Sequence, residues 1–240
     1  MVAAARLDFR RSPVTLSLLA VIVALEIFFN LRPEARNDVY NQWMGIWWQI
    51  WAGEVWRPFT SCLGHGDFLH MAFNAYWLAV FGPLLEERFG SWRTLGLIVL
   101  LGYVSGLPEY IVQGYTREQL GGALGFSGIG YGLFGLFLIG RHYVPEWWVV
   151  CNQQTVQLFV GWFFLCIFLT WAEFMPVANI AHAAGFGFGA LYGRAIFDRP
   201  NRSRWLALSI ILSLAVLATM IACPGHVHYE YAVQRARDMG

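Results

Sequence analysis

The chain has 240 residues, of which 58% are hydrophobic and only 13% are charged, roughly half the charged fraction of a typical soluble domain. This composition excludes an ordinary soluble globular protein, and a formal net charge of +1 gives no indication of nucleic-acid binding. Several apolar runs approach the ~20 residues that a helix needs to cross ~30 Å of hydrocarbon. The sequence therefore predicts an all-α polytopic membrane protein.

Seven apolar segments are predicted as transmembrane spans. In chain order they cover residues 13–30, 68–85, 94–113, 126–140, 156–174, 178–197 and 205–222. The first run lacks a small-residue cleavage site behind it, which indicates a retained span rather than a signal peptide. The chain is accordingly divided into an N-terminal segment (1–12), a six-span core (13–197), a linker with the seventh span (198–222) and a polar tail (223–240).

The distribution of arginine and tryptophan predicts the orientation of the chain. With the N-terminus inside, ten arginines lie on the inner side and six on the outer side, so the positive-inside rule favours this topology, with the C-terminus outside. The long connection 31–67 then lies outside. It is rich in tryptophan, which prefers the headgroup region, and we expect short helices lying in the interface there.

The four cysteines give no metal signal. Cys62, Cys151, Cys166 and Cys223 form no CxxC pair and no ligand spacing, and we predict neither a metal nor a cofactor. Cys62 and Cys223 share the outer side under this topology, and the sequence leaves open whether they form a disulfide.

Three of the predicted spans carry unusual polar residues near their outer ends. The second begins with His70 and Asn74, the fourth with Ser127 and the sixth with His182. Because these spans all run from outside to inside, the polar groups lie at a similar depth. Polar groups in hydrocarbon are costly and should face the bundle interior or a wet cavity.

Small residues at every fourth position explain how the fourth and sixth spans could meet. They are Gly128 and Gly132 on one span and Ala181, Gly185, Gly189 and Gly193 on the other. Such stripes let membrane helices approach closely. Ser127 and His182 each lie next to their stripe, so close contact would bring the two side chains within reach.

The surroundings of Ser127 suit a nucleophile. It follows a glycine-rich stretch that includes Gly125, where tight backbone with positive φ is permitted. Free N–H groups at a helix start favour a developing oxyanion. Tyr131 shares the face of Ser127 and could pack on the histidine of the sixth span. His70 and Asn74, also four residues apart, can donate to the same oxyanion.

Further residues complete an ordered set. In chain order the set is Trp56-Arg57, His65, His70, Asn74, Glu86, Gly90, Gly125-Phe126-Ser127-Gly128, Tyr131, Gly135, Ala181-His182, Gly185 and Gly189. With these residues on these spans, the chain resembles the rhomboid family of intramembrane serine proteases over nearly its whole length. The resemblance implies a rhomboid-like six-helix bundle plus a seventh C-terminal transmembrane helix.

The resemblance also implies an activity and a site. Ser127 would be the nucleophile and His182 the general base and acid, with no aspartate, and His70, Asn74 and the Ser127 backbone N–H would form the oxyanion hole. Supporting positions would be Tyr131, Gly125, Gly128, His65, Gly185 and Gly189. Trp56 and Arg57 would anchor a loop. Glu86 would be structural, with Arg88 or Arg93 as candidate partners.

The partners implied are transmembrane protein substrates, cut in or near their membrane segments, and the lipid bilayer. The membrane would be a bacterial-type plasma membrane, with the N-terminus cytoplasmic and the active site opening to the outer side.

Other interpretations are possible for the same residues. Ser127 alone could be a packing serine in a glycine-rich helix. His65, His70 and His182 could form a metal site, but no carboxylate or thiolate accompanies them. A non-catalytic relative that binds transmembrane clients usually lacks one member of the Ser–His pair. A transporter would show broken helices in two corresponding halves, and the sequence has no such internal symmetry.

Overall fold

The computed structural model describes residues 11–44, 48–116, 124–221 and 233, and the regular elements in these ranges are helical. The α-helices are α1 (Pro13–Leu31), α2 (Pro33–Trp43), α3 (Trp48–Trp51), α4 (Arg57–Thr60), α5 (Phe68–Phe89), α6 (Ser91–Thr116), α7 (Ser127–Gly140), α8 (Gln153–Trp171), α9 (Asn179–Phe197) and α10 (Arg202–Ala218). Short 3-10 helices are η2 (Ser61–Leu63), η3 (Pro145–Trp148) and η4 (Arg199–Asn201). The prediction of an all-α fold is confirmed.

Each predicted span corresponds to a helix, and the differences lie at the ends. The second span was predicted to end at residue 85, but α5 continues to Phe89, and Gly90 ends it with a φ of +79°. The fifth was predicted over 156–174, but α8 begins at Gln153, because the Asn152 side chain accepts a hydrogen bond from the Thr155 N–H and caps the helix there. Apart from residue 233, the polar tail with Cys223 lies outside the described residues, as does most of the N-terminal segment.

The described helices differ in how well they suit a bilayer. Five helical segments are long and apolar enough to cross one: α1, α5, residues 91–112 of α6, α8, and Arg199–Ala218 containing α10. The helix α7 has 14 residues and is therefore ~21 Å long, shorter than the ~30 Å hydrocarbon core. One end of α7 must lie within the thickness of the membrane. The helix α9 contains His182, Arg194 and several glycines, which lower its apolar character.

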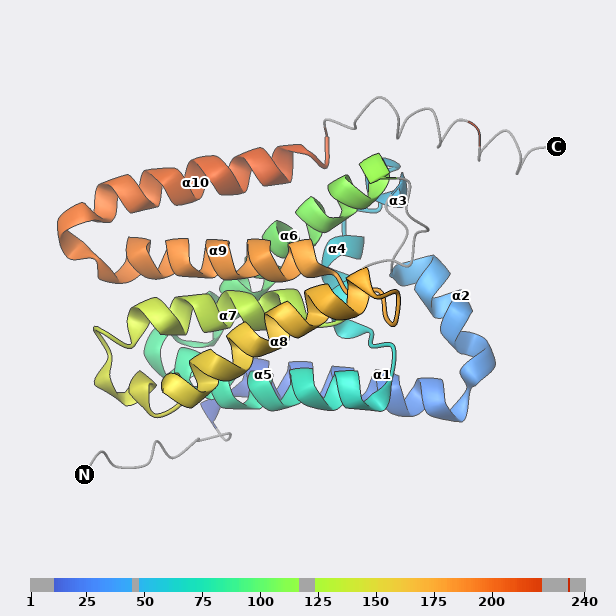
Figure 1. Ribbon diagram of the computed structural model, residues 1–240, viewed down its shortest axis with the longest axis horizontal. Helices are drawn as coiled ribbons and strands as arrows, with labels where there is room; N and C mark the ends of the chain where they lie inside the picture. The colour runs from blue at the N-terminus through green and yellow to red at the C-terminus, as the bar shows by residue number, and fades with distance from the viewer. Residues whose placement is uncertain (1–10, 45–47, 117–123, 222–232, 234–240) are drawn as a thin grey trace.

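The helix α7 forms the centre of the bundle. Figure 1 shows α9 alongside α7, with α5 and α1 on its other side, α8 crossing in front and α10 outside α9. Residues 128–137 of α7 are all buried. Its aromatic rings pack outward: Phe134 stacks on Phe159 of α8 at 4.2 Å between ring centroids, and Phe137 stacks on Trp147 at 4.1 Å. Functional groups at the start of α7 are thereby held in a close-packed interior.

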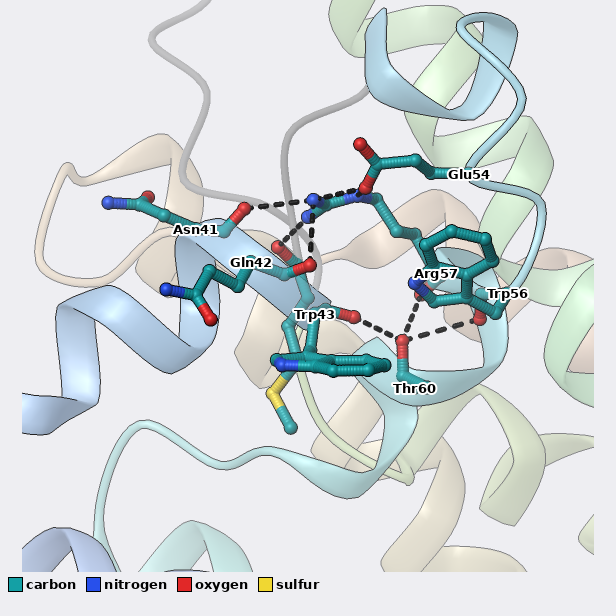
Figure 2. A network of polar contacts seen from close by, with 8 residues as sticks. Asn41, Gln42, Trp43, Glu54, Trp56, Arg57 and Thr60 are labelled. Carbon is teal, nitrogen blue, oxygen red and sulfur yellow. Dashed lines mark hydrogen bonds and ion pairs between the residues drawn. The ribbon is translucent and has the colours of Figure 1, made fainter.

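The connection between α1 and α5 contains the short helices α2, α3 and α4, so the prediction of short helices between residues 31 and 67 is confirmed. Its anchor is Arg57, which is only 1% exposed. Figure 2 shows the Arg57 guanidinium group directed at Glu54 and at backbone carbonyls near the end of α2. It donates to the carbonyls of Asn41 at 2.8 Å and of Met44 at 2.8 Å. Five donors on one planar group suit such a site, which a single ammonium group could not fill.

Trp56 and Glu86 are the other two residues for which a structural role was predicted. Trp56 is 41% exposed, with its ring 6.5 Å from that of Trp43. Glu86 is buried and accepts hydrogen bonds from the N–H groups of Val14 and Thr15 and from the Thr15 hydroxyl. It therefore caps the start of α1, and its partners in the structure are these groups instead of the predicted arginines of neighbouring sequence.

Candidate active site

Ser127 and His182 form a hydrogen-bonded pair inside the bundle. Ser127 is the first residue of α7, and His182 lies in the first turn of α9. The Ser127 Oγ and the His182 Nε2 are 2.7 Å apart. His182 is 2% exposed, while Ser127 is partly exposed. When Nδ1 carries the ring proton, Nε2 is free to accept the serine proton, which is the arrangement of a nucleophile and its base.

The two helices approach closely enough for this bond because glycines line their contact. A Cβ atom added to Gly185 would overlap the carbonyl oxygen of Gly128, and one added to Gly189 would overlap that of Gly132. These obstacles are backbone atoms, which no change of side-chain rotamer could move away. The predicted contact between the two small-residue stripes is confirmed, and it places the starts of α7 and α9 side by side.

Gly125 shapes the turn before Ser127. Its φ is +107°, a conformation that L side chains rarely adopt. A side chain here would also displace the imidazole of His70, since an added Cβ would lie 2.6 Å from its Cε1 atom. The N–H of Gly125 donates to the carbonyl of Ser61 at 3.1 Å, which ties the turn to η2. The imidazole of His70 consequently lies against the loop that carries the nucleophile.

Tyr131 supports the histidine. Its ring stacks on the His182 imidazole, with 4.6 Å between centroids and 26° between planes. Its hydroxyl donates to the carbonyl of Phe159 on α8 at 2.9 Å, which fixes the ring in place. The Nδ1 atom of His182 is buried and has no hydrogen-bond partner among the described residues. The orientation of the imidazole therefore depends on Tyr131, on Ser127 and on the backbone of α9.

The start of α5 places His70 and Asn74 on the same side as Ser127. Asp67 caps this helix by accepting from the His70 N–H at 2.9 Å. Asn74 is 4% exposed, and its Nδ2 donates to the His70 carbonyl at 2.9 Å. An amide nitrogen carries two protons, so one N–H of Asn74 remains available for a further acceptor.

His65 lies just before α5 and contacts the same loop. Its Nε2 accepts from the N–H of Phe126, the residue before Ser127, at 3.4 Å, and its ring lies 5.0 Å from that of His70. Burial is the main cause and the neighbouring His70 a smaller one, and the pKa of His65 is lowered to about 3. His65 is thus neutral at physiological pH, as an acceptor at Nε2 must be.

The pKa of His65 predicts a pH dependence of stability. An unfolded histidine binds a proton below pH ~6.5, whereas folded His65 does not until about pH 3. Stability should therefore fall as the pH drops through this window, by up to about 1.4 kcal/mol per pH unit from this one group. Thermal unfolding in mild detergent at several pH values checks it. The His65→Gln variant should have a shallower slope than the wild type, and equal slopes would contradict the assignment.

The described residues contain no group of three or more histidine, cysteine, aspartate or glutamate side chains arranged to hold a metal ion. Cys62, Cys151 and Cys166 are buried free thiols. The question of a Cys62–Cys223 disulfide, which the sequence left open, involves a residue outside the described ranges.

One buried carboxyl group near the site was missed by the sequence analysis. Glu109 of α6 is 5% exposed and accepts a hydrogen bond from the N–H of Ala181, the residue before His182, at 2.9 Å. The signal available in the sequence was a glutamate inside an apolar span, directly after Pro108. An ionisable residue within a membrane helix marks a candidate functional position.

The fold and site together define a polytopic helical membrane protein with a serine–histidine pair in its interior. A family model described as "Rhomboid domain" matches residues 52–199. The chain belongs to the rhomboid family.

Curated relatives agree with this membership. A protein named Rhomboid protease GlpG from Enterobacter sp. (strain 638) is 28% identical over 186 residues, which cover 75% of this chain and 62% of the relative. Proteins of the same name from Serratia proteamaculans (strain 568) and Salmonella typhi are each 27% identical, over 81% and 77% of this chain. The matches span 66% and 63% of those relatives, so this chain covers less than two thirds of their length.

Proposed function

We propose that this protein is an intramembrane serine endopeptidase that hydrolyses peptide bonds in or near the transmembrane segments of other proteins. The observation that carries the proposal is the 2.7 Å contact between Ser127 Oγ and His182 Nε2, at the start of a helix too short to span the bilayer. A packing serine would not need a buried histidine as its partner. The family membership and the names of the relatives support the same reaction.

The proposed mechanism is acyl transfer. His182 takes the Ser127 proton while Oγ attacks the scissile carbonyl carbon, and a tetrahedral oxyanion forms. His182 then gives the proton to the leaving amine, and the C–N bond breaks to leave an ester on Ser127. Water, deprotonated by His182, hydrolyses this ester and restores the serine.

The oxyanion would be stabilised by donors around the start of α7. The first N–H groups of a helix have no carbonyl partner within that helix, and the positive end of its dipole favours negative charge. His70 and the second N–H of Asn74 can add side-chain donors. Together these groups would stabilise negative charge that develops only in the transition state. Interactions that are made only in the transition state lower the barrier and raise kcat.

Orientation and substrates follow from the same proposal. The bias of arginine supports a cytoplasmic N-terminus, with the start of α7 toward the outer side, and we propose a bacterial-type plasma membrane as the location. Substrate helices must unwind locally, since their carbonyls are otherwise occupied by their own hydrogen bonds. Segments that contain helix-breaking residues should therefore be preferred. The alternative is a non-catalytic relative that binds transmembrane clients, which the complete Ser–His pair disfavours.

The test is cleavage of a panel of single-span proteins by the purified protein in lipid vesicles. We expect cleavage of those with a helix-breaking residue, inhibition by a fluorophosphonate or isocoumarin, and no effect of EDTA or phenanthroline. Retention of intact substrates without cleavage would favour the client-binding alternative. Loss of activity with chelators and recovery with zinc would instead identify the histidines as metal ligands.

A further inference from the structure

Glu109 supplies an acceptor that the start of α9 lacks. The residue at the N-cap of α9 is Ala178, which makes no side-chain capping bond. Ala181, the third residue of the helix, donates its N–H to the Oε2 of Glu109 at 2.9 Å. This N–H has no carbonyl partner within its own helix. A carboxyl group from another helix thus completes the turn that contains His182.

The same face of α6 also contacts the other half of the site. Ser105 lies one helical turn before Glu109 and is 1% exposed. A Cβ atom added to Gly128 would lie 2.7 Å from the Ser105 Oγ, so this side chain is in contact with the residue that follows Ser127. Two polar residues of α6 therefore touch the immediate sequence neighbours of the nucleophile and of its base.

Placement of the α9 backbone matters because, among the described residues, no hydrogen bond holds the far side of the imidazole. The Nδ1 of His182 has no hydrogen-bond partner in the described part of the chain. Stacking on Tyr131 still permits the ring to slide in its own plane. The position of the first turn of α9 is therefore a main determinant of the distance from the His182 Nε2 to the Ser127 Oγ.

We propose that Glu109 is a positioning residue for the reaction, whose carboxyl group fixes the first turn of α9 and thereby aims His182 at Ser127. This inference rests on the proposed function. A shift of ~1 Å in a reacting group can lower the rate about 10²-fold. Loss of the cap should displace His182 by less than this and should therefore lower the rate about tenfold.

Glu86 offers a matched control. It is buried to a similar degree, 4% exposed against 5% for Glu109, and it also caps a helix start by accepting backbone N–H groups. It lies 16 residues after His70 in the same helix, ~24 Å away along the axis. Removal of either carboxyl group should reduce stability, but only the loss of Glu109 should affect the catalytic geometry.

The experiment compares Glu109→Met, Glu109→Gln and Glu86→Met with the wild type, well below their unfolding temperatures. Glu109→Met should lower kcat about tenfold with KM unchanged, slow the labelling of Ser127 by a fluorophosphonate, and raise hydrogen exchange in residues 178–185. Glu109→Gln, which keeps an oxygen acceptor, should restore all three readouts toward wild type. Glu86→Met should lower the unfolding temperature and leave kcat unchanged.

Two results would overturn the inference. One is Glu109→Met with wild-type kcat and exchange, and the other is Glu109→Gln as impaired as Glu109→Met, which would show that the acceptor oxygen is not what matters. If Glu109→Met does not fold, Glu109→Asp withdraws the acceptor by one methylene and should give the same slower labelling and faster exchange. A wild type that neither cleaves nor labels would refute the proposed function, while the exchange measurement would still test the cap.

Discussion

Ser127→Ala and His182→Ala should each lower kcat by on the order of 10⁴- to 10⁶-fold, as removal of a nucleophile or its base does in serine proteases. The two groups act as one unit through the contact between Ser127 Oγ and His182 Nε2. The double variant should therefore be no worse than the more impaired single variant. Cleavage of one substrate by all four proteins, at matched amounts of folded enzyme, measures this non-additivity.

A serine-directed probe separates the two roles. The wild type should be labelled at Ser127, Ser127→Ala should not be labelled, and His182→Ala should be labelled far more slowly because no base activates the hydroxyl. Tyr131→Phe keeps the ring that stacks on His182 and loses only the bond to Phe159 that fixes it, so its labelling should be slower than that of the wild type and faster than that of His182→Ala. Equal labelling of the wild type and His182→Ala would remove His182 from the proposed mechanism.

The sequence predicted the helices and the meeting of α7 with α9 because both depend on patterns that it displays directly. Apolar runs located every span to within a few residues. The four-residue spacing of small residues identified the faces of α7 and α9 that touch, and with them the proximity of Ser127 and His182. The ends of the helices were harder to predict, since they depend on single capping residues such as Asn152 at α8 and Gly90 after α5.

Two of the buried carboxyl groups, Glu86 and Glu109, show what the sequence could not predict. Glu86 was expected to pair with an arginine close to it in sequence, but its partners are backbone groups at the start of α1, 71 and 72 residues away. Glu109 was not singled out, although its partner at Ala181 is equally distant, 72 residues away. A backbone N–H has the same chemistry at almost every position, so no residue type marks it as the target of a distant side chain.

The close approach of α7 and α9 predicts that a substitution at the glycine contact between them should also have a large effect on activity. Gly185→Ala places a methyl group against the Gly128 carbonyl oxygen, a backbone atom beside Ser127, whereas Gly187, two residues along the same helix, has open space around its Cβ position. Overpacking of a tight interior costs typically about 1–3 kcal/mol, and it can be relieved here only by separating the two helices. Separation lengthens the contact between Ser127 and His182.

We therefore expect Gly185→Ala to lower the unfolding temperature and to reduce kcat by roughly 10²-fold, the cost of a displacement of ~1 Å. Gly187→Ala should keep full activity and be as stable as the wild type, or more stable by up to about 1 kcal/mol, because alanine favours helix over glycine. Thermal unfolding and the rate of Ser127 labelling measure both effects. Identical behaviour of the two variants would mean that the α7–α9 backbone contact does not set the geometry of the pair, because the substitutions differ only in what the new methyl group meets.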